Sequence, residues 1–286
     1  MLKLGIKDIQ YLDFALDERK NFEKAKLHGF DGLDFGAFTS ASSEFLNLHL
    51  NEYEKRLTSY QKQASEFGIE FHQAHGLWWI NDSNLEERKS NVALYKKQIM
   101  GTSFLGCKNL VIHPFCAGGW ELENLCEAKK TFDGNIEVLE ELLPTAREFG
   151  VTLCLENLPF PRFSHAFTHT VKQLIEAVND EHVKACLDTG HANVMKEDSY
   201  TAVKNLGKDL RCLHIHDNYG DTDAHNHPFD GTFDWKGFTK ALKEINYSGY
   251  LSYEVGVSKE LPEQERAEKL ISLANILKDF AKEIEN

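Results

Sequence analysis

The chain has 286 residues, of which 42% are hydrophobic and 27% are charged, and its 32 basic and 45 acidic side chains give a formal net charge of −13. This is the composition of an ordinary globular protein whose core is large enough to need no covalent cross-links. No apolar run approaches the roughly 20 residues of a membrane span, the first residues lack a secretory signal, and the six cysteines form no CxxC pair, so we expect a cytoplasmic protein with no membrane segment.

One pattern recurs from the start of the chain to its end. An amphipathic stretch ends in glycine, a short β-branched or aromatic run follows, and a polar loop leads to the next amphipathic stretch. A residue just past a helix often needs a positive φ, and glycine takes that conformation without strain. The glycines at the four clearest joints are Gly29, Gly68, Gly106 and Gly150.

The pattern predicts eight strands that alternate with eight helical stretches. The strands are expected near 2–6, 31–35, 69–75, 108–113, 151–156, 183–188, 211–216 and 249–255. The longest helical stretches are expected near 51–67, 131–149 and 262–283. Strict alternation requires a parallel sheet, because each helix is a crossover, and eight such units close into a (β/α)8 TIM barrel. We therefore predict one α/β domain over residues 1–286. The alternative is an open doubly wound sheet, but no glycine-rich phosphate loop follows the first strand.

The ends of the expected strands are rich in side chains that can bind a metal. Reactive groups of such barrels lie at the C-terminal ends of the strands. Six of the eight strands end in or carry such a residue, and these are His75, His113, Glu156, Asp188, His214 and Glu254. Residues two apart on a strand share a face, so a layer of small side chains is expected beneath four of these residues. The layer consists of Cys154, Cys186, Cys212 and Ser252, and its thiols are expected to be buried and inert.

This density of inward carboxylates and imidazoles argues for a divalent cation, because a buried charge costs several kcal/mol unless it is paired or metal-bound. Mixed histidine and carboxylate ligands suit Mn, Zn, Co or Fe(II) better than calcium. Beyond this cluster lie His191 in the turn after Asp188, and Asp223 and His225 in the loop after the seventh strand. For that loop, ligation and a solvated polar loop both remain open. Eight of the 13 histidines are expected at this face, and they are His72, His75, His113, His191, His214, His216, His225 and His227. His165 is expected to be an ordinary surface or helix residue.

Four motifs carry a family resemblance that spans essentially the whole chain. They are LEN at Glu156, LDTGHAN at Asp188 and His191, HIHDN at His214, and YEV at Glu254. With them the sequence resembles the xylose isomerase-like TIM-barrel superfamily, which joins sugar isomerases and epimerases with the endonuclease IV group. The resemblance implies that Glu156, Asp188, His214 and Glu254 hold one metal and that His191 contacts substrate. His75, His113, Asp223 and His225, together with His191, resemble the further ligands that give the nucleases a three-zinc cluster, so one to three ions are expected.

Three functions are compatible with this pattern. The first, which we favour, is a metal-dependent isomerase or epimerase of a sugar, sugar phosphate or polyol, in which a metal-stabilised enediolate forms between Glu156 and Glu254 as base and acid. His75, His113, His191 and Trp78 would then help to bind the substrate. The second is zinc-dependent hydrolysis of abasic DNA, and the third is a barrel with no catalytic activity.

The number of basic residues in the loops expected at the C-terminal ends of the strands distinguishes the first function from the second. A duplex binder neutralises phosphates with Lys or Arg, yet these loops supply only Arg162, Lys196 and Lys259, so nucleic acid is not the favoured partner. Ketose 3-epimerases that the chain resembles carry a glutamate where Arg162 stands, which argues against that reaction. Phe160, Phe163 and Phe167 are expected to be exposed and would permit a homodimer that covers the pocket.

Overall fold

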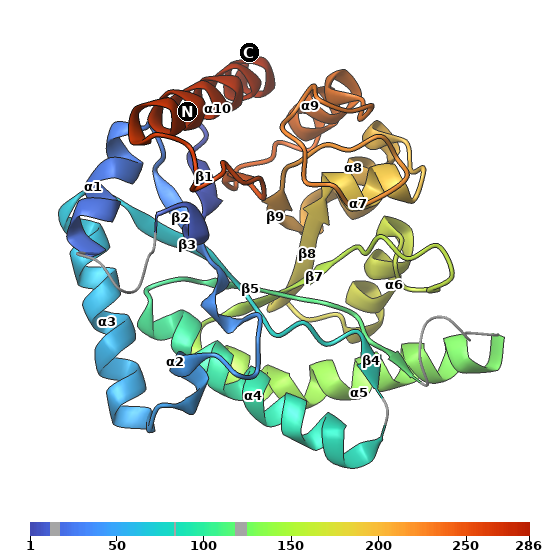
Figure 1. Cartoon of the computed structure of the whole chain (residues 1–286). Coiled ribbons are helices and arrows are strands. Elements are labelled where there is room, and N and C mark those ends of the chain that lie inside the picture. The colour runs from blue at the N-terminus through green and yellow to red at the C-terminus, as the bar shows by residue number, and fades with distance from the viewer. Residues whose placement is uncertain (12–17, 83, 118–124) are drawn as a thin grey trace.

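Eight parallel strands form the centre of the molecule, and helices surround them (Figure 1). The computed structural model describes residues 1–11, 18–82, 84–117 and 125–286. The strands of this sheet are β1 (Leu4–Lys7), β2 (Gly32–Phe35), β3 (Glu70–His75), β5 (Asn109–Ile112), β7 (Thr152–Glu156), β8 (Val183–Asp188), β9 (Leu210–His214) and β10 (Leu251–Tyr253). Their order in space is β10-β1-β2-β3-β5-β7-β8-β9.

A parallel bridge between Ile215 and Tyr253 joins the two edges of this sheet. The amide of Ile215 donates to the carbonyl of Ser252 at 2.8 Å, and the amide of Glu254 donates to the carbonyl of Ile215 at 3.1 Å. The bridge closes the sheet into a barrel, which confirms the predicted TIM barrel and rules out the open doubly wound sheet. Closure also brings the end of β9 beside the end of β10, where His214 and Glu254 lie.

The helices bury one face each against the barrel. The longer ones are α1 (Glu18–Leu27), α3 (Leu50–Glu66), α4 (Leu85–Phe104), α5 (Leu125–Phe149), α6 (Thr168–Val178), α8 (Ser199–Leu206), α9 (Trp235–Glu244) and α10 (Glu263–Glu285). Short helices α2 (Glu44–Asn47) and α7 (Thr189–Val194) follow β2 and β8. In α10 the buried residues include Leu270, Leu273, Leu277 and Phe280, which is the stripe that packs on the barrel.

Helix α4 is longer than the sequence pattern indicated. It has 20 residues against 17 in α3, so the expectation that 51–67 is among the three longest helical stretches was wrong. The buried face of α4 contains polar Gln98 and Thr102, which interrupt its apolar spacing. Gln98 is buried because its side chain accepts from the Leu77 amide at 3.1 Å and donates to the Phe38 carbonyl at 2.9 Å.

The helix-to-strand joints have the expected backbone. Gly29, Gly68, Gly106 and Gly150 have φ angles of 99°, 67°, 69° and 65°, which a side chain would disfavour. These glycines end each helix abruptly and let the next strand start within a few residues.

A second parallel pair, β4 (Asn81–Asp82) with β6 (Cys116–Ala117), extends the chain beyond β3 and β5 and was not foreseen.

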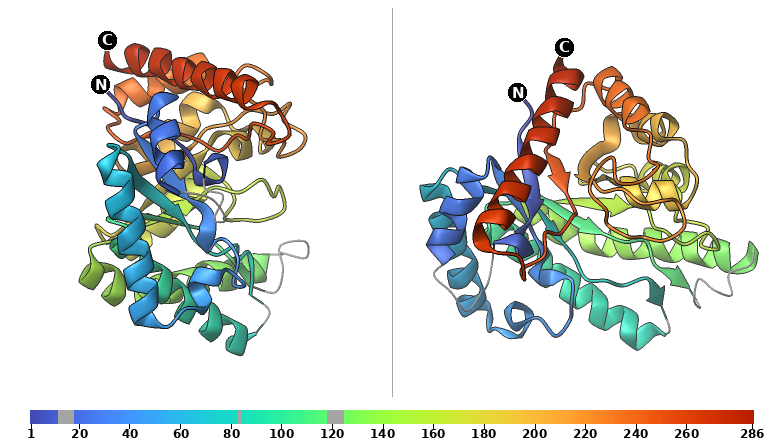
Figure 2. Two further views of the ribbon diagram at one scale, coloured as in Figure 1. Left: turned by 60° about the vertical axis from the view of Figure 1, so that its left-hand side comes forward. Right: turned by 45° about the horizontal axis from the view of Figure 1, so that its top comes forward.

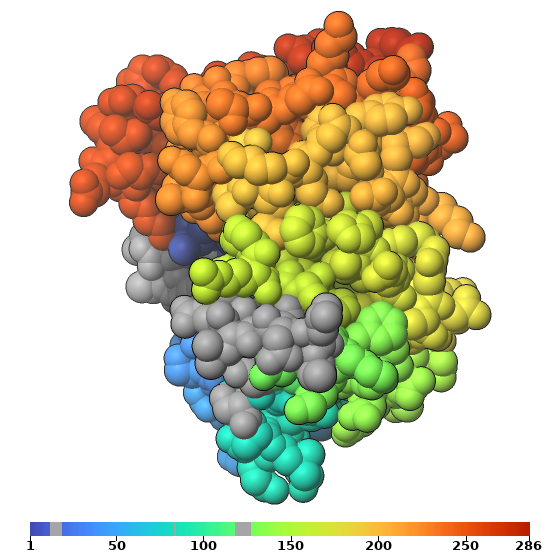
Figure 3. Space-filling view, turned by 90° about the vertical axis from the view of Figure 1, so that its right-hand side faces the viewer, coloured from blue at the N-terminus to red at the C-terminus, as the bar shows by residue number. Residues whose placement is uncertain are grey.

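Consecutive strand–helix units lie next to one another around the barrel. In the space-filling view, bands of colour follow chain order from cyan through green and yellow to orange (Figure 3). Both chain ends lie at the same side of the molecule (Figure 2), where the Met1 amine lies 3.0 Å from a Glu285 oxygen. Within the described ranges, no helix combines the length and the apolar character needed to cross a bilayer.

The expected layer of small side chains lies inside the barrel below the strand ends. Cys154, Cys186 and Cys212 form a buried cluster with Val111, and the sulfurs of Cys154 and Cys212 are 3.5 Å apart. His72 lies beside Ser252 of this layer, with its Nε2 2.9 Å from Ser252 Oγ and its ring stacked on Tyr250. It therefore lies below the C-terminal ends of the strands, and the expectation that it belongs to that face was wrong. Glycines at positions 5 and 32 leave room for its ring: a Cβ on the first would lie 2.4 Å from it.

Two further expectations about side chains were wrong. His165 is buried, bonded to Ser164 Oγ at 2.7 Å and packed against Phe132, so it is not an ordinary surface residue. Phe163 is only 1% exposed and packs with Leu158 in a small cluster. This residue therefore cannot contribute to an exposed aromatic surface.

Candidate metal centre

The four residues expected to hold one metal meet at the C-terminal end of the barrel. Glu156 ends β7, Asp188 ends β8, His214 ends β9 and Glu254 follows β10. All four are buried, and each offers a ligand atom within 4.8 Å of those of the other three. The strand register explains the meeting, because Asp188 and His214 are paired neighbours on β8 and β9.

His214 lies at the centre of this group. Its Nδ1 is 2.7 Å from Glu156 Oε1 and 3.0 Å from Glu254 Oε2. Its Nε2 is 3.0 Å from Asp34 Oδ2, and Asp34 also accepts from Gln73 Nε2 at 3.1 Å. A histidine that binds metal through one ring nitrogen usually donates the other to a carboxylate. The ring is therefore oriented with Nδ1 toward the candidate cation position.

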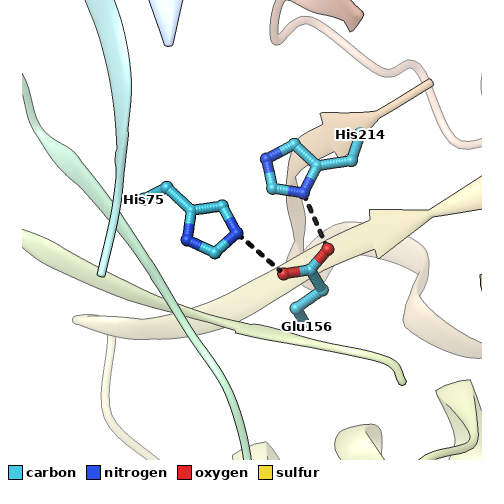
Figure 4. Close-up of side chains that lie close together, drawn as sticks. All are labelled: His75, Glu156 and His214. Atoms are coloured by element: carbon cyan, nitrogen blue, oxygen red, sulfur yellow. Dashed lines mark hydrogen bonds and ion pairs between the residues drawn. The ribbon is translucent and has the colours of Figure 1, made fainter. Parts of the chain in front are cut away.

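His75 and His113 approach Glu156 from the neighbouring strands. His113 Nε2 lies 3.0 Å and His75 Nε2 3.8 Å from Glu156 Oε2. Figure 4 shows the rings of His75 and His214 directed toward the two oxygens of this carboxylate, and the two rings are stacked with centroids 5.3 Å apart. The Trp78 ring meets His113 edge-on at 4.5 Å and is 47% exposed, so it stands at the mouth of the barrel.

A second group lies beside Asp188, where the loop after β9 folds back over the site. His191 Nε2 and His225 Nε2 lie 3.2 Å and 3.1 Å from the same oxygen of Asp223, Oδ2. His216 Nε2 lies 2.9 Å from Asp188 Oδ2 and 3.6 Å from Asp223 Oδ1. Each of two overlapping sets, Asp188 with His191 and His216, and His216 with Asp223 and His225, has its ligand atoms within 4.8 Å of one another.

Buried Asp217 holds this loop in place. It accepts from the Phe229 and Phe233 amides, each at 3.1 Å, and from Trp235 Nε1 at 3.0 Å. The backbones of Asp217 and Asn226 also exchange two hydrogen bonds. This pairing positions the preceding residue, His225, so that its ring stacks on that of His216 with centroids 4.2 Å apart. His227 lies 3.2 Å from the carbonyl of Gly256, which follows β10, and it belongs to none of the metal-capable sets found among the described residues.

The electrostatics of the site favour ionised carboxylates. Burial opposes the charged forms of Glu156 and Glu254, but the charge of His214 outweighs it and holds the pKa of both carboxyls well below the usual range. Burial and the nearby His113 lower the pKa of His75 to about 4, so this ring is neutral near pH 7. Burial acts in the same direction on His191, yet Asp188 and Asp223 raise its pKa to about 10.

The donor set fits a divalent cation. Among the described residues, Glu156 Oε2, His113 Nε2 and Asp223 Oδ1 are buried atoms with no hydrogen-bond partner of suitable geometry. Most buried polar groups in proteins are hydrogen-bonded, so unmatched lone pairs at one place need another partner. Carboxylate oxygens and neutral imidazole nitrogens are the ligands that zinc, manganese and iron accept.

Three residues of the site were not identified from the sequence as site residues. Asp34 lies on β2, Lys7 ends β1 and forms an ion pair with Glu254, and His216 follows β9. Asp34 and Lys7 stand at the ends of the two strands for which no metal-capable residue was proposed. A search for polar side chains in the last two positions of those strands would have found both, and the HIH spacing already placed His216 at this face.

Comparison with known proteins gives one family and a consistent set of relatives. The family model described as xylose isomerase-like TIM barrel matches residues 22–277. D-psicose 3-epimerase of Agrobacterium fabrum is 26% identical over 243 residues, which cover 81% of this chain and 77% of that protein. The uncharacterized protein y4fM of Sinorhizobium fredii is 28% identical over 172 residues, which cover 59% of this chain and 53% of that protein.

Solved structures have the same fold. The crystal structure of the IolI protein with a bound zinc atom superposes with a TM-score of 0.75 at 21% identity, and the match covers 99% of this chain and 98% of that one. At this identity the likeness establishes the architecture. Other relatives and structural neighbours include D-psicose 3-epimerases, an inosose isomerase and an L-ribulose 3-epimerase, and one relative is a probable endonuclease 4.

Proposed function

The chain belongs to the xylose isomerase-like TIM barrel family, and from this premise we propose that it is a divalent-metal-dependent isomerase or epimerase of a sugar, sugar phosphate or related polyol. One observation carries the proposal: Glu156, Asp188, His214 and Glu254 converge from four strand ends with their ligand atoms within 4.8 Å. A relative that is a D-psicose 3-epimerase supports a sugar as the substrate.

The chain's own residues divide the chemistry between two faces. Glu156 Oε1 and Glu254 Oε2 both lie near His214 Nδ1, and their low pKa keeps them ionised and able to accept a proton from carbon. A bound divalent cation would supply Lewis-acid stabilisation of the enediolate that remains when this proton leaves. Glu156 would then act as base, and Glu254, which must first take up a proton despite its low pKa, would act as acid on the other face of the substrate.

Other residues would bind and orient the substrate. His191 is fixed by the Asn157 carbonyl at 2.8 Å on Nδ1, which directs its Nε2 toward Asp223 Oδ2 at 3.2 Å. His75, His113 and Trp78 line the opposite side, where the half-exposed indole can cover a sugar ring. Arg162 is exposed in the loop after β7. The ketose 3-epimerases that this chain resembles carry a glutamate at this position, so we favour a substrate other than a ketose epimerised at C3.

The test replaces the proposed base and ligand by its amide. Glu156→Gln should lower turnover by at least about a thousandfold, because the site loses a proton acceptor and a ligand oxygen together, while the far-UV circular dichroism stays native. Glu70→Gln, at the opposite end of the barrel on β3, is the matched control and should keep full activity. Both are assayed on a panel of free sugars, sugar phosphates and keto-inositols after metal analysis. A metal-replete Glu156→Gln protein with normal turnover would exclude this role.

A second function rests on a separate observation. Eight of the nine residues that resemble the nuclease ligands fall in the metal-capable sets, and the ninth, His113, lies 3.0 Å from Glu156. We propose zinc-dependent phosphodiester hydrolysis as the alternative. The loops at the C-terminal ends of the strands supply three basic side chains. Lys196 donates to the Gly220 carbonyl and Lys259 faces a separate cavity, which makes binding of a DNA duplex less favourable. Cleavage of an abasic oligonucleotide with three zinc ions per chain would favour this alternative.

A further inference from the structure

A second cavity lies outside the barrel mouth, between α1 and the start of α10. Its volume is about 310 Å³, and its lining combines polar side chains with the apolar surface of Leu270. None of the residues that converge at the candidate metal centre lines it. The cavity therefore belongs to a different site from the one described above.

The lining of this cavity is positively charged in an acidic protein. Lys24, Lys259 and Arg266 face it, and Glu263 is its one carboxylate among the described lining residues. Glu263 is already paired with Lys24 across the two helices. His28 also lines the cavity, and burial followed by the charges of Lys24 and Arg266 lowers its pKa, as expected where the local potential is positive.

Two donors in this cavity lack acceptors. Arg266 donates from Nη2 to the Gln10 carbonyl, but its Nε is buried and has no hydrogen-bond partner in the described part of the chain. No described carboxylate lies within 4.0 Å of this guanidinium, although 45 of the 286 residues are acidic. Asn21 Nδ2 is a second buried donor without a partner among the described residues. Buried donors without acceptors are costly, and a ligand that brings oxygen atoms would satisfy both.

We propose that the cavity between α1 and α10 binds a small molecule that carries a phosphate or carboxylate group. The oxyanion accepts hydrogen bonds from Arg266 and Asn21, with Lys259 as a further counter-charge, and the rest of the ligand packs against Leu270 and the Tyr11 ring. The inference is independent of the reaction at the barrel mouth, because it uses none of those residues.

The cavity is connected to the barrel mouth through Gln10. The Gln10 side chain accepts from the Val257 amide at 3.0 Å, and its carbonyl accepts from Arg266. Gln10 lies three residues after Lys7, and Val257 lies three residues after Glu254. Hydrogen bonds therefore join Arg266 to the segment that follows Lys7 and to the segment that follows Glu254.

Calorimetric titration of the full-length protein as purified, at constant ionic strength, tests the proposal with inorganic phosphate and pyrophosphate as probes. We expect saturable binding with one site per chain. Arg266→Gln should weaken it by at least about tenfold, since a charge-assisted hydrogen bond is lost. Lys269→Gln removes one exposed positive charge from the same helix outside the cavity and should change affinity less than about twofold.

Asn21→Leu keeps the test decisive if Arg266→Gln does not fold. Asn21 Nδ2 makes no hydrogen bond within the described residues, so its replacement should leave thermal stability unchanged or higher while it weakens phosphate binding. Two results would overturn the proposal: no saturable binding of either probe up to about 20 mM, or binding that Arg266→Gln and Asn21→Leu leave unchanged. The second result would place the anion elsewhere, for example at the barrel mouth.

Discussion

Among single residues, Asp34 has the clearest role that can be separated from ligation. It is fully buried, and its Oδ2 receives hydrogen bonds from both His214 and Gln73. It offers no ligand atom to the sets of metal-capable groups found in the described chain, so it acts through the orientation of His214. Sequence reasoning found His214 from its motif but not its partner, because the contact joins residues 180 positions apart.

Asp34→Asn should weaken metal binding by about 10- to 100-fold while the ligands themselves remain intact. The asparagine keeps the shape of the side chain but loses the negative charge that orients and polarises the imidazole. Competition with a chromogenic chelator measures the dissociation constant directly. Asp31→Asn, just before β2 on the same segment, is the control and should not change it. Equal affinity in the two variants would show that Asp34 has only a packing role.

Asp8 gives a prediction about pH. It is 4% exposed, and burial together with the charge of Asp34 raises its pKa to about 7, against 3.8 for an accessible group. The folded state therefore holds a proton that the unfolded state releases, and stability falls as the pH rises from about 4 to about 7.

Asp8→Asn removes this dependence. Its free energy of unfolding should equal that of the unmodified protein near pH 4 and exceed it increasingly up to about pH 7, by at most roughly 4 kcal/mol, with a constant difference above that pH. Urea denaturation at a series of pH values, with metal removed, provides the measurement. A difference that is constant across this range, or that grows toward low pH, would contradict the assigned protonation.

Among the elements, the loop between β9 and α9 shows where sequence patterns stop being informative. Its acidic residues and histidines allowed either ligation or a solvated loop, and composition could not decide between them. In the structure the carboxylate of buried Asp217 accepts from residues 229, 233 and 235 and thereby returns Asp223 and His225 to the site, while metal ligation by this loop stays a prediction. His225 takes a φ of 49°, a left-handed conformation that residues other than glycine adopt rarely.

Asp217→Ala should release this loop. Several buried donors lose their acceptor at once, so we expect a loss of roughly 3 kcal/mol or more in the free energy of unfolding. Amide hydrogen exchange should rise over residues 218–233 but not in the strands. Asp221→Ala, an exposed change in the same loop, should leave both measurements unchanged. Normal protection of the loop in Asp217→Ala would show that other contacts hold it.

For the whole molecule, the regular part of the fold could be predicted from the sequence and the irregular part could not. Alternating strand and helix patterns predicted the barrel, and the positive φ of Gly68, Gly106 and Gly150 bears out the reading of the joints. The same logic located six strand ends that meet around one space. The depth at which a side chain lies inside the barrel could not be predicted from its own strand. His72 is an example, because its ring occupies the space left by Gly5 and Gly32 on other strands.

The proposed activity requires a cation bound where β7, β8, β9 and β10 end. The most direct test is a crystal soaked in manganese or zinc, with anomalous difference maps calculated at the absorption edge of each metal. We predict a strong peak surrounded by Glu156, Asp188, His214 and Glu254, with any further peaks beside His75 and His113 or beside Asp223 and His225. A map with no peak among those four residues at full soaking concentration would contradict the central claim.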